Sequence, residues 1–416
     1  MLSQRLLART LGVDAKSVRV ENVDLVDENV EIRLRPRIKH RWRCPHCQKR
    51  CPGYDPGRER RWRALDFGRT KVFVVARVPR VRCFEHGVVV AAVPWARHGA
   101  RHTLAFEQLA AWCAVEMSST AAARLLRCTW RTIGQIIARV VAELSDDELL
   151  EGVTRIGIDE IAYRRHYRYL LVVVDHDRRR LIHAVDGAHP TSLNAFFDLL
   201  GEERTQAITH VSADGAPWIA RTVTRRCPQA IMCADTFHVV QWAGDALDLV
   251  RRELWNEVRE RRRDLARRRA YGAGKILNES RWSLWKKPEN LSDAERARLD
   301  YIAATHPRLH RAWALKEGLR VAVTSTGPGA IAALDRWINW AQRCRIAQFV
   351  RLARRIREYR SAIVATIEHG LTNALVESFN TKIRLITRRA FGFHNVNALI
   401  ALARLTLSGQ RPKLPT

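Results

Sequence analysis

Three carboxylates stand where metal-dependent chemistry at phosphorus would need them. Asp159 lies in the apolar stretch IGIDEIA, Asp214 directly follows a second such stretch in HVSADGAP, and Glu377 opens ALVESFNTKIRLITRR. Carboxylates brought side by side at the ends of strands repel each other unless a cation lies between them, and such oxygen ligands suit Mg²⁺. A third acid would complete a two-metal site for in-line displacement at phosphorus.

Each acid also has a purely structural interpretation. An Asp at the end of a strand is often a turn former or a helix cap, and Asp214 before Gly-Ala-Pro fits that role well. The combination of acids with the order of the strands favours the catalytic interpretation. Glu160 adjoins Asp159, but neighbours on a strand point to opposite faces, so we expect no metal at Glu160.

The segment around Glu377 is predicted to be a helix with one functional face. Asn373, Asn380 and Arg384 lie four residues before, three after and seven after Glu377, so all four side chains share that face. A run of cations follows the acid and is expected to hold phosphate: Lys382, Arg384, Arg388 and Arg389.

The elements that must position the two aspartates alternate strand and helix. The order between residues 153 and 252 is three strands, helix, strand, helix, strand, helix. The first three strands follow one another through short polar turns, which predicts an antiparallel meander. The stretches, in order, are TRIGIDEIA, RYLLVVVD, RLIHAVD, TSLNAFFDLL, AITHVSAD, PWIARTVTRR, AIMCAD and TFHVVQWAGDALDLVRREL.

Two short knuckles near the N-terminus have metal-ligand spacing. CPHC provides Cys44 and Cys47, and CFEH provides Cys83 and His86. Paired ligands of this kind predict a tetrahedral structural Zn²⁺. His86 is the least secure ligand, because many zinc ribbons end the second knuckle in Cys; the nearest replacements are Cys51 and His46. With nine cysteines, several at metal spacing, structural disulfides are not expected.

The stretch MSSTAAARLLRCTWRTIGQIIARVV reads as a helix-turn-helix, with residues 119–126 and 131–141 as its helices. In such a motif the start of the second helix faces base edges. The candidate DNA contacts are therefore Thr129, Trp130, Arg131 and Thr132. An ordinary helical hairpin that joins two domains remains the alternative.

Composition points to a polyanionic partner. The chain of 416 residues has 72 Lys and Arg against 43 Asp and Glu, for a formal charge of +29. Such a balance favours nucleic acid, because cations on phosphate release counterions. Two arginine blocks, residues 259–269 and 351–360, are either solvated helix faces or phosphate contacts. No apolar run is long enough for a bilayer span, so we expect a cytoplasmic, nucleoid-associated protein.

Four blocks, in this order, carry a resemblance to a known family. IGIDEIAYRRHYRYLLVVVD, VSADGAPWIA, CADTFHVVQWAGDALDLVRRE and LVESFNTKIRLITRRAFGFHN resemble bacterial insertion-sequence transposases of the DDE type, most closely the ISL-three group. The resemblance implies a ribonuclease-H-like core, Mg²⁺ or Mn²⁺ held by Asp159, Asp214 and Glu377, and a zinc module. It also implies double-stranded DNA, as element ends and target, and a homo-oligomer.

The same resemblance suggests how the chain is divided. Because 163 residues separate Asp214 from Glu377, a helical insertion is expected within the α/β core. The expected parts are a zinc module (1–100), a helix-turn-helix (101–150), the first part of the core (151–252), the insertion (253–365) and the rest of the core (366–416).

One further pair stays open. Related transposases carry a Cys- or Asp-x-x-His motif where this chain has Asp235 and His238, so His238 is a candidate catalytic residue that contacts the scissile phosphate. Alternatively, Asp235 caps the following helix and His238 bonds within it. Three rival functions also remain: a regulator with a dead site, a structure-specific nuclease with the same core, and a zinc-dependent nucleoid protein.

Overall fold

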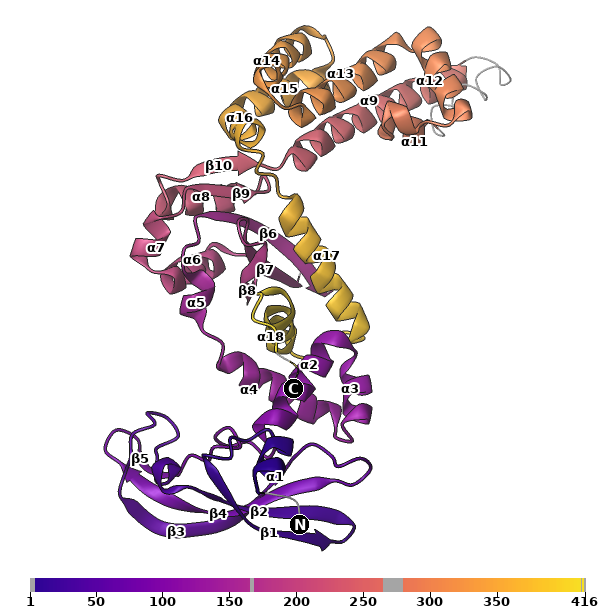
Figure 1. Cartoon of the computed structure of the whole chain (residues 1–416). Helices are drawn as coiled ribbons and strands as arrows, with labels where there is room; N and C mark the ends of the chain where they lie inside the picture. The colour runs from indigo at the N-terminus through magenta and orange to yellow at the C-terminus, as the bar shows by residue number, and fades with distance from the viewer. Residues whose placement is uncertain (1–3, 165–167, 265–279, 413, 415–416) are drawn as a thin grey trace. The chain divides into compact units, whose positions relative to one another are not determined.

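The computed structural model describes residues 4–164, 168–264, 280–412 and 414. The chain divides into two compact units, which are described separately. The first joins Met1–Asp146 to Leu385–Thr416, and the second is Asp147–Arg384. Figure 1 shows the course of the chain and the labels of its elements.

The first unit begins with a mixed β-sheet in the order β1-β2-β4-β3, with β5 added on β4. The pair β2 and β4 is parallel and the other pairs are antiparallel. Its core is apolar, with Trp62, Val74 and Trp95 buried among its members. The elements are α1 (Gln4–Thr10), β1 (Val18–Val26), β2 (Asn29–Pro36), η1 (Ile38–His40), β3 (Gly53–Arg63), β4 (Val72–Cys83) and β5 (Gly87–Val90).

A group of helices completes the first unit: α2 (Leu104–Glu116), α3 (Ser119–Leu125), α4 (Trp130–Ala142) and α18 (Val396–Leu407). Ser118 caps α3 and Thr129 caps α4, each through its side-chain oxygen. The two helices predicted for the helix-turn-helix are therefore present, within one or two residues of the expected bounds. The C-terminal helix α18 packs against α2 and α4.

The second unit contains the predicted order of strands and helices. Its mixed sheet runs β10-β9-β6-β7-β8. The meander β6, β7, β8 is antiparallel, whereas β6, β9 and β10 are parallel. The strands are β6 (Arg155–Arg164), β7 (Arg168–Asp175), β8 (Arg180–Asp186), β9 (His210–Ala213) and β10 (Ile231–Ala234).

One face of this sheet is covered by α6 (Pro190–Leu200) and α8 (Pro217–Arg226), which bury Phe196, Phe197 and Ile219 against Ile156 and Ile158. Two short helices that the sequence did not predict, α5 (Asp146–Leu150) and α7 (Glu202–Gln206), lie at the edges of this layer. On the other face, α17 (Ala374–Arg389) approaches β6 where Gly157 leaves room for the side chain of Val376.

The remaining helices of the second unit form one bundle with its own apolar core. The long helix α9 (Thr236–Asp264) starts just after β10 and packs against α13 and α15. The other helices are α11 (Arg281–Trp285), η2 (Pro288–Asn290), α12 (Asp293–Thr305), α13 (Pro307–Thr324), α14 (Pro328–Arg343), α15 (Ala347–Glu358) and α16 (Arg360–His369). Most of the first arginine block, residues 259–269, lies outside the described side chains.

Candidate functional site

Three aspartates come directly after the aligned, paired positions of three parallel strands: Asp159 lies within β6, and Asp214 and Asp235 directly follow β9 and β10. Ile158 of β6 is the register partner of Ala213 of β9, and Ala213 is the register partner of Ala234 of β10. The next residue along each strand is an Asp: Asp159, Asp214 and Asp235. Since neighbouring strands lie about 4.8 Å apart, the sheet itself sets these carboxylates in a row, with Asp214 in the middle.

The charges in this row affect one another. Burial, together with the negative charge of Asp214, raises the pKa of Asp159 to about 6. A buried carboxylate beside another one favours either a proton or a cation as its neighbour. The row therefore has the electrostatic character of a cation-binding site.

Glu160 points away from the row, as predicted. Its Oε1 accepts a hydrogen bond of 2.9 Å from the indole Nε1 of Trp218, which belongs to the opposite face of the sheet. This contact gives Glu160 a structural partner on α8.

Helix α17 is joined to the row by Asn380. The Nδ2 of this buried side chain donates a 2.7 Å hydrogen bond to Oδ2 of Asp159. Among the described residues, Oδ1 of Asn380 is buried without a hydrogen-bond partner. An acceptor without a partner, in an amide that is bonded to the Asp159 carboxylate, fits a hydrated cation, which would present water or its own positive field to that oxygen.

A second polar contact fixes the start of α17. Oδ1 of Asn373 accepts a 2.9 Å hydrogen bond from Ser212 Oγ, and Ser212 Oγ lies 2.8 Å from His176 Nε2. Ser212 is two residues before Asp214 and so lies on the same face of β9.

These two contacts bracket Glu377. Asn373 and Asn380 lie four residues before and three after Glu377, so the face of α17 that carries all three is turned toward β9 and β6. Within the described chain, no hydrogen bond or ion pair joins the half-buried Glu377 carboxylate to Asp159 or Asp214. The structure thus brings together Asp159, Asp214 and Asp235, and presents Glu377 from the helix opposite.

The contacts of Asp235 fit both interpretations of the Asp-x-x-His motif: Asp235 caps the helix, and it also orients the His238 imidazole. Asp235 Oδ1 accepts from the backbone N–H of Phe237, as a helix cap does, and Oδ2 lies 2.6 Å from His238 Nδ1. This bond, more than the charges of Asp214 and Asp159, raises the pKa of His238. Since Nδ1 is engaged by Asp235, the imidazole is oriented with Nε2 as its remaining polar atom.

Sequence reasoning did not identify a further cation beside the row. A side chain at Gly215, next to Asp214, would lie 2.9 Å from the indole of Trp242 and 3.9 Å from Arg355 Nη2. The guanidinium of Arg355 lies over that indole, 3.6 Å from the ring centroid. The only signal in the sequence was the arginine block on residues 351–360, which does not single out Arg355.

The cations of α17 have different environments. Lys382, Arg384 and Arg388 are exposed. Arg389, in the first unit, donates hydrogen bonds to the carbonyls of Val115 and Ala114 at the end of α2. Its guanidinium therefore has a packing role that the sequence did not predict.

The four predicted zinc ligands converge in the first unit. The ligand atoms of Cys44, Cys47, Cys83 and His86 all lie within 4.8 Å of one another. Cys83 Sγ is 3.5 Å from His86 Nδ1, and Cys47 Sγ is 3.7 Å from Cys83 Sγ. The set of three thiols and one imidazole at these separations fits a tetrahedral Zn²⁺.

The two replacement ligands stand outside this cluster. The Cys51 thiol lies 3.4 Å from the Lys49 carbonyl, and the ring of His46 stacks on His86 with centroids 4.9 Å apart.

In the helix-turn-helix, the four candidate contacts divide into two pairs. Thr129 Oγ1 accepts from the backbone N–H of Thr132, and the two hydroxyls are 2.9 Å apart. These threonines serve the cap of α4. Trp130 and Arg131 are exposed on the first turn of the helix, where a base edge would be met.

Comparison with known proteins agrees with this architecture. A family model described as a transposase matches residues 156–403, one for the helix-turn-helix domain of transposase family ISL3 matches 91–141, and one for the zinc-finger of the IS204, IS1001, IS1096 and IS1165 transposases matches 40–86. The transposase for insertion sequence element IS1557 of Mycobacterium tuberculosis is 49% identical, over all of this chain and 98% of the relative. The transposase for IS1001 of Bordetella parapertussis is 27% identical, over 98% of this chain and 99% of the relative.

The matched domains and relatives define an enzyme of the DDE transposase class, with DNA-binding and zinc-ribbon domains. The chain belongs to the ISL3 family of insertion-sequence transposases, the ISL-three group that its sequence resembles. The zinc-ribbon match and the Cys and His cluster together support a structural zinc. Within the described part of the chain, no helix combines the length and apolar character needed to cross a bilayer.

Proposed function

We propose that the row of aspartates, with Glu377 presented by α17, is the catalytic site of this transposase. The observation that carries the proposal is the alignment of Asp159 and Asp214 directly after the last paired residues of the parallel strands β6 and β9, with α17 bonded to Asp159 through Asn380. The sheet order and the interrupting helical bundle support a ribonuclease-H-like core, formed by residues 151–252 and 366–416 around an insertion of 253–365. In this division the zinc module is 1–100 and the helix-turn-helix 101–150.

Asp159, Asp214 and Glu377 would hold Mg²⁺ or Mn²⁺, which supplies charge neutralisation at the phosphoryl group and at the attacking oxygen. Asn380 orients Asp159, and Ser212 and Asn373 hold the start of α17 so that Glu377 faces the two aspartates. His238, oriented by Asp235, would contact the scissile phosphate. Arg355 and the exposed cations of α17 hold the flanking phosphates.

The reaction has two steps. Water attacks the phosphodiester at the end of the element, and the bond to the 3′ oxygen breaks. The 3′-hydroxyl released then attacks a phosphodiester of the target DNA, and the target strand's 3′ oxygen leaves. The zinc module and the helix-turn-helix, through Trp130 and Arg131, bind the terminal repeats. Because two ends must be joined, the active form is a homo-oligomer.

Cleavage and strand transfer test this assignment. Purified chain is given its own element-end DNA and target DNA with Mg²⁺, beside Asp159→Ala, Asp214→Ala and Glu377→Ala. We expect each variant to bind the ends and neither cut nor join. Glu368→Ala is the matched control, since it is the nearest other acid before α17 and should remain active. Activity in Glu377→Ala would remove Glu377 from the site.

A nuclease with the same site is the second candidate. It shares the carboxylate row and differs only in the fate of the 3′-hydroxyl. Products in which that hydroxyl is joined to target DNA support the transposase, whereas cleavage without joining under the same conditions supports the nuclease.

A further inference from the structure

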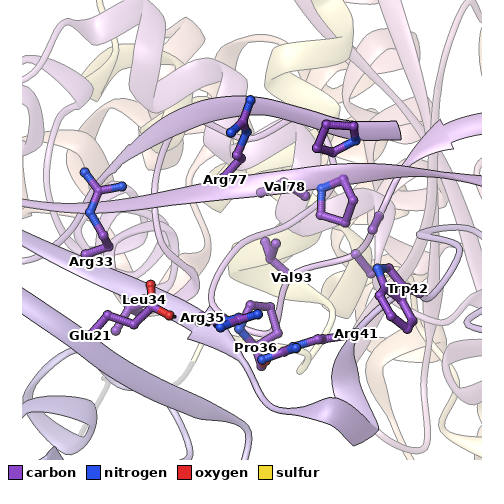
Figure 2. A pocket seen from close by; sticks show the side chains of 14 residues that line it. Glu21, Arg33, Leu34, Arg35, Pro36, Arg41, Trp42, Arg77, Val78 and Val93 are labelled. Carbon is purple, nitrogen blue, oxygen red and sulfur yellow. Dashed lines mark hydrogen bonds and ion pairs between the residues drawn. The ribbon is translucent and has the colours of Figure 1, made fainter. Parts of the chain in front are cut away.

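A pocket opens in the first unit where two parallel strands separate. β2 and β4 pair only from Val30 to Arg33 and from Val72 to Val75. The residues that follow on both strands line a cavity of about 350 Å³, together with Arg41, Trp42 and residues 91–93 (Figure 2). This volume is in the range of sites that hold a small organic ligand.

The lining is strongly cationic. Four arginines and one acid, Glu21, line the pocket, and one of the four, Arg33, is ion-paired with Glu59. The pair between Arg35 and Glu21 is 3.6 Å long and does not reach hydrogen-bond length. Arg41 donates its Nε to the carbonyl of Pro36 at 2.7 Å, and no carboxylate in the described chain forms an ion pair with it.

Arg35 and Arg41 crowd each other beside Pro36, as Figure 2 shows. Burial, and after it the charge of Arg35, lowers the pKa of Arg41. Two guanidinium groups held this close, with a single carboxylate paired to one of them, favour an added anion. Each keeps donors in the planar arrangement that suits a phosphate.

The indole of Trp42 lines the same pocket. Trp42 is 40% exposed and has a φ of 58°, a left-handed conformation uncommon for a bulky residue. Its carbonyl accepts a 2.8 Å hydrogen bond from the backbone N–H of Cys51, and Arg50 lies 5.9 Å from its ring centroid. The loop of the first zinc knuckle thus holds an aromatic ring in the lining of the same pocket as the two guanidinium groups.

We propose that this pocket binds one unpaired nucleotide of the DNA, with its phosphate on Arg35 and Arg41 and its base stacked on Trp42. In a paired duplex both faces of a base are covered by its neighbours, so only an unstacked nucleotide can offer a phosphate and an open base face together. The proposal rests on the proposed function, which supplies the DNA. Under this proposal the zinc module distinguishes an opened DNA end from a paired one.

The test compares two DNA duplexes with the full-length, zinc-loaded chain. One is the paired element end, and the other has the same sequence with the outermost base pairs mismatched. Affinity is measured by fluorescence anisotropy without Mg²⁺, so the result does not depend on cleavage. We expect the wild type to bind the mismatched end roughly tenfold more tightly, as stacking of one base predicts.

Variants assign that preference to the pocket. Trp42→Leu and Arg41→Gln should lose it, Trp42→Phe should keep most of it, and Arg9→Gln, an exposed arginine on α1 outside the pocket lining, should keep all of it. Zinc content and the circular dichroism spectrum show whether each variant is folded.

Two outcomes would overturn the proposal. One is a wild type that binds both duplexes equally. The other is a folded Trp42→Leu variant that keeps the preference, even if Arg41→Gln weakens binding to both duplexes, because the pocket would then be a contact for paired DNA. Failure of the catalytic assignment would appear separately, as cleavage that survives loss of Asp159 or Asp214.

Discussion

Asn380 donates its side-chain N–H to Asp159 across 221 residues of sequence, and this 2.7 Å hydrogen bond joins α17 to β6 in the sheet of the second unit. The bond uses Oδ2 of Asp159, while Oδ1 accepts from the backbone N–H of Glu160 at 2.8 Å. Asp159 therefore has a fixed orientation before any cation arrives.

Asn380→Ala should weaken metal use without weakening DNA binding. Removal of a side chain that orients a ligand typically costs about 10- to 100-fold in metal affinity or activity. The measurement is cleavage rate against Mg²⁺ concentration, in which half-maximal activity should need more metal. Asn194→Ala on α6, where Asn194 bonds the Pro190 carbonyl, is the matched control and should behave as wild type. An unchanged Mg²⁺ dependence in Asn380→Ala would contradict this role.

Gly157→Ala should displace α17 from the sheet. The added Cβ would lie 2.5 Å from Val376 Cγ2 and 2.7 Å from His176 Nε2, closer than real contacts allow. We expect a loss of about 1–3 kcal/mol in the free energy of unfolding and a large loss of cleavage. Chemical denaturation and the cleavage assay measure the two effects.

A second substitution tests the cause. Val376→Ala in the Gly157→Ala background should restore part of both properties, because it removes the nearest clashing atom. Gly244→Ala on α9 has no atom within 4 Å of its Cβ and should not destabilise the chain. If the Gly157→Ala chain cut DNA at the wild-type rate, close packing of α17 at this point would be irrelevant to activity.

Arg355→Ala should lower cleavage more than its neighbour does. Both arginines are exposed, but Arg355 stacks on Trp242 beside the Asp214 loop, whereas Arg354 has no such contact in the described structure. A cation that holds a phosphate near the reaction is expected to contribute about tenfold or more to the rate. Single-turnover cleavage at saturating DNA separates this from binding. Equal losses of cleavage rate in Arg354→Ala and Arg355→Ala would indicate that both arginines act only through their general positive charge.

Acid pH should lower the free energy of unfolding of the second unit, because His176 is protonated more readily in the unfolded chain. Burial lowers the pKa of His176 to about 4, against about 6.5 for an exposed histidine. The neutral form is favoured in the folded chain, so its stabilisation is present above pH 6.5 and is lost as the pH falls from 6.5 to about 4. The loss can reach about 3 kcal/mol in the free energy of unfolding.

Urea unfolding at pH 7, 5.5 and 4.5 measures this dependence. His176→Gln, which cannot titrate, should flatten the pH dependence of the second unit's transition. His102 is the control, because burial also lowers its pKa to about 4 but it lies in the first unit. His102→Gln should leave the second unit's pH dependence unchanged.

Removal of zinc should unfold the zinc module (1–100) and abolish specific DNA binding. The metal would join two distant knuckles, so its binding free energy is part of the folding free energy. We expect one zinc per chain, measured by elemental analysis, and loss of that zinc in Cys44→Ser and His86→Ala. Cys51→Ser and His46→Ala should keep it, since both side chains stand outside the ligand cluster. Zinc loss in Cys51→Ser with retention in His86→Ala would reverse the assignment of the fourth ligand.

The sequence predicted those features that depend on local pattern. Alternation and turn residues predicted the order of strands and main helices along residues 153–252 and the antiparallel meander, and the spacing of Cys44, Cys47, Cys83 and His86 predicted a cluster that the structure forms. The sequence did not predict the strand register. The placement of Asp235 beside Asp214 depends on hydrogen bonds between β9 and β10.

Contacts between distant segments were also not predictable. The stacking of Arg355 on Trp242, the docking of Arg389 on the end of α2 and the packing of α18 on α4 depend on how separate elements meet. No local feature of the sequence distinguishes Arg355 from the other arginines of its block. Such partners are selected by shape and burial in three dimensions, which a single sequence does not display.

Helix α9 has a mechanical consequence. It begins at Thr236, next to Asp235, carries His238 in its first turn, and continues unbroken for 29 residues into the bundle (Figure 1). A helix of that length is a stiff rod of roughly 40 Å. Because no loop separates His238 from the bundle, a displacement of the bundle would tilt the backbone that carries His238.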